Sequence, residues 1–370
     1  MTTTPLAFQQ LALLLPGPPE NAVIFILSYG ITRFEIEIPD FAKATGMSEA
    51  DLWELADEAH LGSDPKAEKR DDQHLVSQAL LRQFCTPTSN GPRMAHYSIQ
   101  FGDRPDVSPQ SVAKLDQFVR IDSKRTEEVW GKVETNLSAA IAAAEAGNLF
   151  SHPEHVATIK DAIALHYARS FDVKDLYEGL WPVFLDAKRA ELRGDPGRLE
   201  HLHRLRTGGT TAPSDAEREE LIEEFVAGAD NLQRSGIAFR YRVVYYFRTA
   251  SSLVANAGLE LHRAPAGSEF LIGDVPVITT DTSGHHRGIA GGTPIGSASL
   301  VAMPLSPTLL VALAQSDSYH VLQAEYVERL NTWQVEAAKR SVFMRQGSPL
   351  VGWPKTVRPP TGPSSKTQSL

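Results

Sequence analysis

The sequence contains a single cysteine, Cys85, among its 370 residues. No disulfide can therefore form within the chain, and no cluster of cysteines can bind a metal ion. No run reaches the roughly 18 consecutive apolar residues of a membrane-spanning helix. The start of the chain has neither the basic segment nor the small-residue cleavage site of a secretory signal. These absences predict a cytoplasmic protein that does not contact membranes.

The chain also has no excess of basic residues, since its formal net charge is -9. Residues 1–70 carry eleven acidic and five basic side chains, whereas residues 346–370 carry three basic and no acidic ones. Hydrophobic residues make up 42% of the chain and charged residues 22%, which is typical of a globular protein of two or three domains. The charge argues against tight, non-specific binding of nucleic acid, but it leaves room for a nuclease with a local basic groove.

The pattern of apolar residues predicts three parts. Residues 1–70 are expected to form a small N-terminal α/β module. Within it, Phe41–Ala59 resembles a helix-turn-helix whose second helix is too acidic to approach phosphate, which favours a structural or partner-binding role. Residues 346–370 are expected to be a disordered tail. The main domain is expected over residues 71–345, the range covered by the family resemblance given below.

Within the main domain, residues 122–256 are dominated by helical periodicity, interrupted by a predicted loop over 194–214. Short strands are predicted between 259 and 313, and a closing helix over 325–344. The predicted fold class is therefore α+β, with a mainly helical middle, a small and mostly C-terminal β-sheet, and the N-terminal α/β module.

Several local motifs allow two interpretations. His152-Pro153-Glu154-His155 places two imidazoles at helical i, i+3 spacing, where one metal ion could bridge them, but a solvated helix start explains the same residues. Arginines interleave with aromatic residues over Phe239–Arg248, as in a surface that stacks bases, although the spacing also fits a core helix. His285-His286 lies in a glycine-rich loop, which is explained by a simple mobile loop or, alternatively, by a lid over a substrate.

The segment Glu269–Val277 combines an apolar strand with a carboxylate, Asp274, at its end. A rigid strand aims such a carboxylate well for catalysis or metal binding, and an aspartate at that position is as often a simple turn former.

Five segments, taken in order, resemble the DUF4238 family, which is named for its unknown function. The segments are Gln73–Phe84, with an opening His74; Ile163–Ser170, ending near Arg169; Phe270–Val277; Met303–Pro307; and a closing helix that contains Asn331 and Arg340. Glu134 falls where the family has an acidic helix. The chain departs from the family's usual pattern at Ser77, where a proline is usual, and at Ser170, where Thr-Pro is usual.

The resemblance implies a shared polar site, whose candidate catalytic residues are His74, Arg82, Glu134, Arg169 and Asp274. Glu134 and Asp274 would hold a divalent ion such as Mg²⁺ or Mn²⁺, the two arginines would bind a phosphate, and His74 would move a proton. This chemistry predicts a metal-dependent phosphodiester or nucleotide hydrolase, such as a nuclease, with nucleic acid or a nucleotide as its partner.

The alternative is a non-catalytic sensor or interaction protein of the bacterial defence or toxin type, with residues 1–70 available to a protein partner. In that case the same charges would form buried pairs, for example Arg82 with Glu134 or Arg169 with Asp274.

Overall fold

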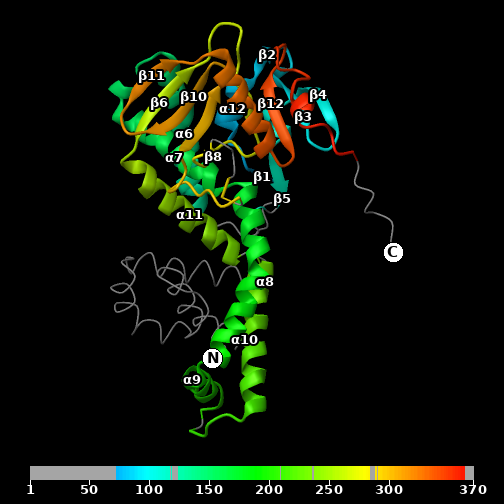
Figure 1. The fold of residues 1–370 in the computed structure, drawn as a ribbon, viewed down its shortest axis with the longest axis vertical. Helices are drawn as coiled ribbons and strands as arrows, with labels where there is room; N and C mark the ends of the chain where they lie inside the picture. Colours follow the sequence, from blue (N-terminus) through cyan, green and yellow to red (C-terminus); the bar gives the residue numbers. More distant parts are fainter. Residues whose placement is uncertain are drawn as a thin grey trace. The chain divides into compact units, whose positions relative to one another are not determined.

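The computed structural model describes most of the chain beyond residue 71 (Figure 1). The described residues are 72–116, 118, 124–208, 210–235, 237–283, 288–289 and 291–362. The predictions for the N-terminal module and for His285-His286 lie outside these residues. None of the described helices is both long enough and apolar enough to cross a membrane.

The described chain divides into two compact units. One contains residues Tyr177–Tyr241, and the other contains the remaining described residues. Both boundaries fall inside helices, namely α8 (Phe171–Arg193) and α11 (Ile237–Ala255). The stretch that was predicted as one domain, residues 71–345, is therefore shared between two units.

The first unit is helical. Besides its parts of α8 and α11 it contains α9 (Pro196–Thr207) and α10 (Asp215–Ser235). The prediction of a loop throughout residues 194–214 is wrong for α9. Proline is accepted in the first turn of a helix, and Leu199 and His203, four residues apart, are both buried.

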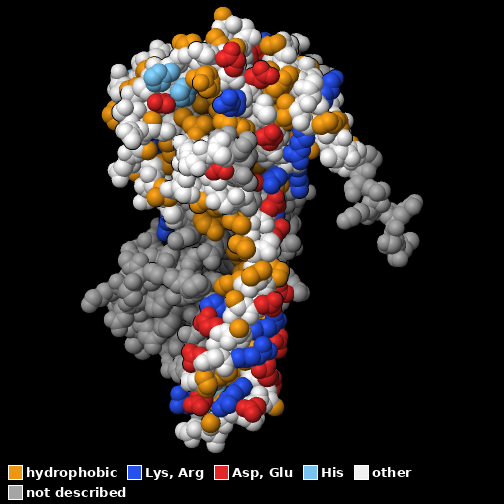
Figure 2. Space-filling model, viewed as in Figure 1, with side chains coloured by type: hydrophobic (Ala, Val, Ile, Leu, Met, Phe, Trp, Pro, Cys, Tyr) orange, Lys and Arg blue, Asp and Glu red, His pale blue; other side chains and the backbone are white. Residues whose placement is uncertain are grey.

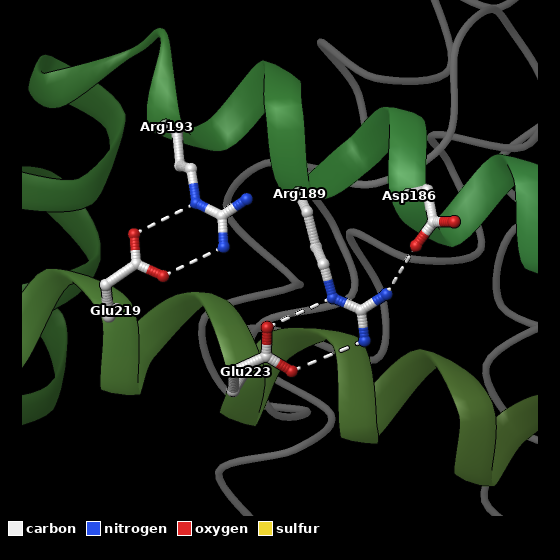
Figure 3. Close-up of polar contacts among 5 residues, drawn as sticks. All are labelled: Asp186, Arg189, Arg193, Glu219 and Glu223. Carbon is white, nitrogen blue, oxygen red and sulfur yellow. Dashed lines mark hydrogen bonds and ion pairs between the residues drawn. The ribbon is translucent and has the colours of Figure 1, made fainter.

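Two ion pairs link α8 to α10 in the first unit (Figure 3). Arg189 Nε lies 3.0 Å from Glu223 Oε1, and Arg193 Nη2 lies 2.9 Å from Glu219 Oε2. A step of four residues forward along α8 matches a step of four backward along α10, so the two helices run antiparallel. Basic and acidic side chains alternate over this face (Figure 2). Because all four side chains are at least partly exposed, these pairs fix the register more than they stabilise the fold.

The second unit contains two five-stranded sheets and a two-stranded one (Figure 1). The first sheet has the order β11-β6-β10-β9-β8, and all of its pairs are antiparallel except β11 with β6. Its strands are β6 (Gly258–Arg263), β8 (Ile278–Thr280), β9 (Leu300–Ser306), β10 (Leu309–Ala314) and β11 (Ser318–Val321).

The second sheet has the order β2-β3-β12-β7, with β4 also paired to β3. Its strands are β2 (Thr86–Thr88), β3 (Gly91–Ser98), β4 (Gly102–Val107), β7 (Ile272–Gly273) and β12 (Ser341–Arg345), and the two-stranded sheet joins β1 (Asp72–His74) to β5 (Lys114–Asp116). The α+β prediction is confirmed, with strands contributed from both ends of the described chain.

Helix α12 (Ala324–Ala337) packs against both large sheets. Val327 and Leu330 join Phe270 and residues of β9 and β10 in one hydrophobic cluster. Val335 joins Leu271 and residues of β3 and β12 in another. Phe270 and Leu271 point to opposite sides of an extended chain, so this one segment contributes to both cores.

The other helices of the described residues are α5 (Gln78–Leu81), α6 (Lys124–Glu145), α7 (Pro153–Ala168) and α13 (Pro354–Val357), with single 3₁₀ turns at Arg82–Phe84, Pro109–Ser111 and Leu149–Ser151. Helices α6 and α7 pack against each other. The predicted apolar stripe of α6 is confirmed at Val133, Leu137 and Ile141, which are buried. The core interpretation of Phe239–Arg248 is also supported, because Phe239, Val243 and Phe247 are buried.

Two predictions at the C-terminal end are wrong. The closing helix ends at Ala337, and Ser341–Arg345, predicted as helix in part, pairs with β3 as a strand. The tail predicted as disordered is folded through residue 362. Its apolar side chains Leu350, Trp353 and Val357 pack on the core, and Tyr97 Oη donates a hydrogen bond to the Arg358 carbonyl.

Candidate functional site

Two of the predicted site residues, Glu134 and Arg169, form an ion pair between α6 and α7. Arg169 follows the last residue of α7, and its Nη2 lies 2.5 Å from Glu134 Oε1. The guanidinium side chain is 7% exposed, whereas the carboxylate side chain is 32% exposed. The pair therefore has a buried cation and an anion that reaches solvent.

The Arg169 guanidinium has further contacts, and one of its donors has no partner in the part of the chain that the structure describes. Its central carbon lies 5.1 Å from the centre of the Trp130 ring, one turn of α6 before Glu134. Its Nε is buried and makes no hydrogen bond to any described residue. An arginine presents five N–H donors, so the bond to Glu134 leaves part of the hydrogen-bonding capacity of this guanidinium unused among the described residues.

His74, at the end of β1, lies within electrostatic reach of this pair. Burial lowers the pKa of His74, with Lys114 and Arg169 acting in the same direction, while Glu134 opposes them. Its Nε2 lies 2.8 Å from Gln78 Nε2. The predicted site residues His74, Glu134 and Arg169 are thus brought into one region, which we call the polar cluster.

His166, which the sequence interpretation did not single out, anchors the polar cluster from α7. Its side chain is wholly buried, its Nε2 accepts a hydrogen bond from the Ser77 backbone N–H at 3.1 Å, and its Nδ1 lies 2.7 Å from the Ala162 carbonyl oxygen. Burial lowers the pKa of His166 to about 4, so the ring is neutral at pH 7. The one sequence signal that could have pointed to His166 is its position three residues before Arg169, a spacing that places both side chains on the same side of a helix.

Arg82 makes no described contact with Glu134 or Arg169. It is exposed, and among the described residues its side chain makes one hydrogen bond, from Nη2 to Gln78 Oε1 at 3.3 Å. Gln78 therefore contacts both Arg82 and His74. The predicted pairing of Arg82 with Glu134 is not found, because Glu134 pairs with Arg169.

Asp274 occupies a different place, after β7, where it binds backbone amides. Its Oδ1 accepts a hydrogen bond from the Lys339 N–H at 2.8 Å, and its Oδ2 accepts from Arg340 at 2.8 Å and Ser341 at 3.1 Å. Burial raises the pKa of Asp274 to about 6, against the opposing effect of the three amides. Asp274 thus holds the turn between α12 and β12, and the predicted pairing of Arg169 with Asp274 is not found.

The junction between α7 and α8 lies near both groups of residues. On one side of the junction, Arg169 pairs with Glu134. On the other side, Asp172 Oδ1 lies 2.8 Å from Lys339 Nζ, and the centre of the Phe171 ring lies 4.7 Å from the Arg340 guanidinium carbon. Asp274 acts on this region through Lys339 and Arg340. No described contact joins the Asp274 carboxylate to that of Glu134.

The described chain is thus an α+β protein whose polar cluster combines a buried arginine, a partly exposed carboxylate and a histidine of lowered pKa. Residues 72–348 match the family model described as "Protein of unknown function (DUF4238)". This match covers well over half of the sequence, so the chain belongs to the DUF4238 family. No curated protein and no solved structure matches it.

Proposed function

We propose that this protein is a hydrolase of phosphodiesters or nucleotides, and that the polar cluster of His74, Glu134 and Arg169 is its active site. The observation that carries the proposal is the buried Nε donor of Arg169, which has no partner among the described residues and lies beside a carboxylate that reaches solvent. A desolvated guanidinium attracts an anion far more strongly than an exposed one does. A phosphoryl group is an anion that matches the geometry of its N–H donors.

His74 is proposed to transfer the proton. Because its pKa is lowered, it is neutral at pH 7 and able to take a proton from an attacking water. The water oxygen would then form a bond to phosphorus while the bond to the leaving oxygen breaks. Arg169 would stabilise the negative charge that develops on the phosphoryl oxygens.

The role of a metal ion stays a prediction. Glu134 has a partly exposed carboxylate that could bind Mg²⁺ or Mn²⁺ together with water. Both oxygens of Asp274 already accept backbone hydrogen bonds. We therefore propose that Asp274 supports the site through Lys339 and Arg340, and we build no step on an ion bound by both carboxylates.

A second candidate is the non-catalytic sensor or interaction protein. It is favoured by the structural hydrogen bonds of Asp274 and His166, which need no substrate to explain them. On this interpretation the pair of Glu134 and Arg169 fixes α6 against α7.

The test is a cleavage assay with labelled single- and double-stranded RNA and DNA and free nucleotides, with Mg²⁺, Mn²⁺ or EDTA. Variants H74N, E134Q and R169K are compared with R82A, whose exposed side chain contacts Gln78 and none of the three cluster residues directly. We expect H74N and R169K to lose on the order of 10²-fold or more in rate while melting close to the wild type. R82A should retain most of the activity.

Absence of turnover with every substrate, together with a lower melting temperature for E134Q and R169K, would reject the hydrolase and favour the interaction protein. Turnover that survives EDTA would reject only the metal requirement.

A further inference from the structure

We propose that His152, Glu154 and His155 bind a divalent transition-metal ion of the zinc class at the start of α7. Their ligand atoms all lie within 4.8 Å of one another, the one such group of histidine, cysteine or acidic side chains among the described residues. His152 Nδ1 lies 3.5 Å from Glu154 Oε1, and the centres of the His152 and His155 rings lie 5.2 Å apart. The proposal does not depend on the proposed hydrolase.

The separation of these atoms is close to what a metal ion needs. With bonds of about 2.0–2.1 Å, ligand atoms around a tetrahedral ion lie about 3.3 Å apart. The 3.5 Å between His152 Nδ1 and Glu154 Oε1 is already near this separation, and small side-chain rotations would bring a ring nitrogen of His155 to the same distance from both. The sequence spacing alone predicted that two imidazoles could share an ion. In the structure Glu154 faces His152, so its carboxylate would be a third ligand.

These side chains interact mainly with one another: His152 pairs with Glu154, and the Glu154 carboxylate also accepts a hydrogen bond from its own backbone N–H. His152 stands at the N-cap position of α7 but makes no capping hydrogen bond with its side chain. Pro153 follows it in the first turn and restricts the backbone there, so the ligands are partly preorganised. The side chains of His152 and Glu154 are 43% and 67% exposed, which leaves an open route for an ion and for a coordinating water.

The ligand types select the ion. Two imidazole nitrogens and one carboxylate suit Zn²⁺, Co²⁺ or Ni²⁺, whereas Mg²⁺ and Ca²⁺ prefer oxygen ligands. A set of two histidines and one glutamate leaves a position for water. The positive end of the α7 dipole opposes a bound cation, so we expect affinity on the order of micromolar rather than nanomolar.

The test uses the full chain without a polyhistidine tag, stripped with chelator and titrated with Co²⁺. Visible absorption reports coordination, and competition with Zn²⁺ gives its affinity. We expect one ion per chain, with H152A and H155A each weakening binding at least about tenfold and E154Q weakening it less.

The matched control is H320A, which removes a histidine from a different cluster. His320 stacks on His262 at 5.7 Å beside Glu260, and Figure 2 shows this group of histidine and acidic side chains over β6 and β11. H320A should bind Co²⁺ as the wild type does. The proposal is overturned if saturable binding is absent below about 1 mM, or if H320A abolishes binding that H152A and E154Q leave unchanged.

Discussion

At the scale of single residues, the charged side chains of this protein differ in how much of their bonding capacity is used. Asp274 accepts three backbone hydrogen bonds with its two oxygens. Arg169 uses one amino group on Glu134 and leaves its Nε free of described partners. A fully satisfied buried group is typical of architecture, and an unsatisfied one calls for an explanation such as a ligand. This contrast is why Arg169, and not Asp274, is at the centre of the site that we propose.

His166 gives a prediction about pH. The pKa of its buried ring is lowered from 6.5 to about 4, so the unfolded chain takes up a proton over this range before the folded chain does. The stability that the neutral ring contributes is therefore complete above pH 6.5 and is lost as the pH falls toward 4. We expect H166F to lower the free energy of unfolding by about 2 kcal/mol at pH 7.5, because the Ser77 N–H loses its acceptor.

Urea unfolding at pH 7.5, 6 and 5 measures this difference. The difference in the free energy of unfolding between wild type and H166F should become smaller as the pH falls. His96, whose pKa burial also lowers to about 4, remains in both proteins and serves as the common background. A gap that stays constant over this range would show that His166 does not titrate as we infer.

At the scale of elements, α12 is the part that joins the two large sheets. The Asn331 side chain accepts a hydrogen bond from the Leu271 N–H at 3.0 Å and donates one to the Glu269 carbonyl at 2.8 Å. Gln334 does the same for the Gly273 N–H and the Pro276 carbonyl, both at 2.8 Å. These two carboxamides satisfy a buried backbone segment that neighbouring strands pair only in part.

This contact makes Gly273 sensitive to substitution. A Cβ atom there would lie 2.9 Å from the Gln334 carbonyl oxygen and 3.3 Å from the Ala338 Cβ. We expect G273A to lower the free energy of unfolding by about 1–3 kcal/mol through overpacking. The matched control is G131A within α6, where a Cβ meets nothing within 4 Å and alanine should stabilise the helix by about 0.5–1 kcal/mol. Equal effects of the two variants in urea unfolding would contradict this interpretation.

At the scale of the whole molecule, the C-terminal segment belongs to the second unit. Residues 348–362 add Leu350, Trp353 and Val357 to the cluster around Tyr97, and the Thr361 N–H donates to the Ile99 carbonyl. A chain truncated after Gly347 would expose this cluster and leave Tyr97 Oη without the Arg358 carbonyl.

We therefore expect truncation after Gly347 to lower the melting temperature by at least about 5 °C. Truncation after Gly362 removes none of these contacts and should leave the melting temperature unchanged. Thermal unfolding followed by circular dichroism compares the two. An equal melting temperature for both truncated chains would mean that the segment does not contribute to the fold.

Local sequence patterns predicted much of this protein. The stripe of Val133, Leu137 and Ile141 gave the buried face of α6, and the alternation of short apolar runs predicted most strands of the first sheet. The ordered motifs identified the family. These features depend on the spacing of neighbouring residues, which is a local property. Where long-range pairing competes, as in Ser341–Arg345, the helical pattern misled because pairing with β3 decided the structure.

The sequence by itself determined which residue types are available, and only the tertiary structure decided their partners. Glu134 pairs with Arg169, 35 residues away, and Asp274 binds amides more than 60 residues away. A charge in the interior needs a partner, but which one it meets depends on how distant segments pack. Likewise, the sequence offered two imidazoles at the start of α7, and the backbone turn there brought Glu154 to them.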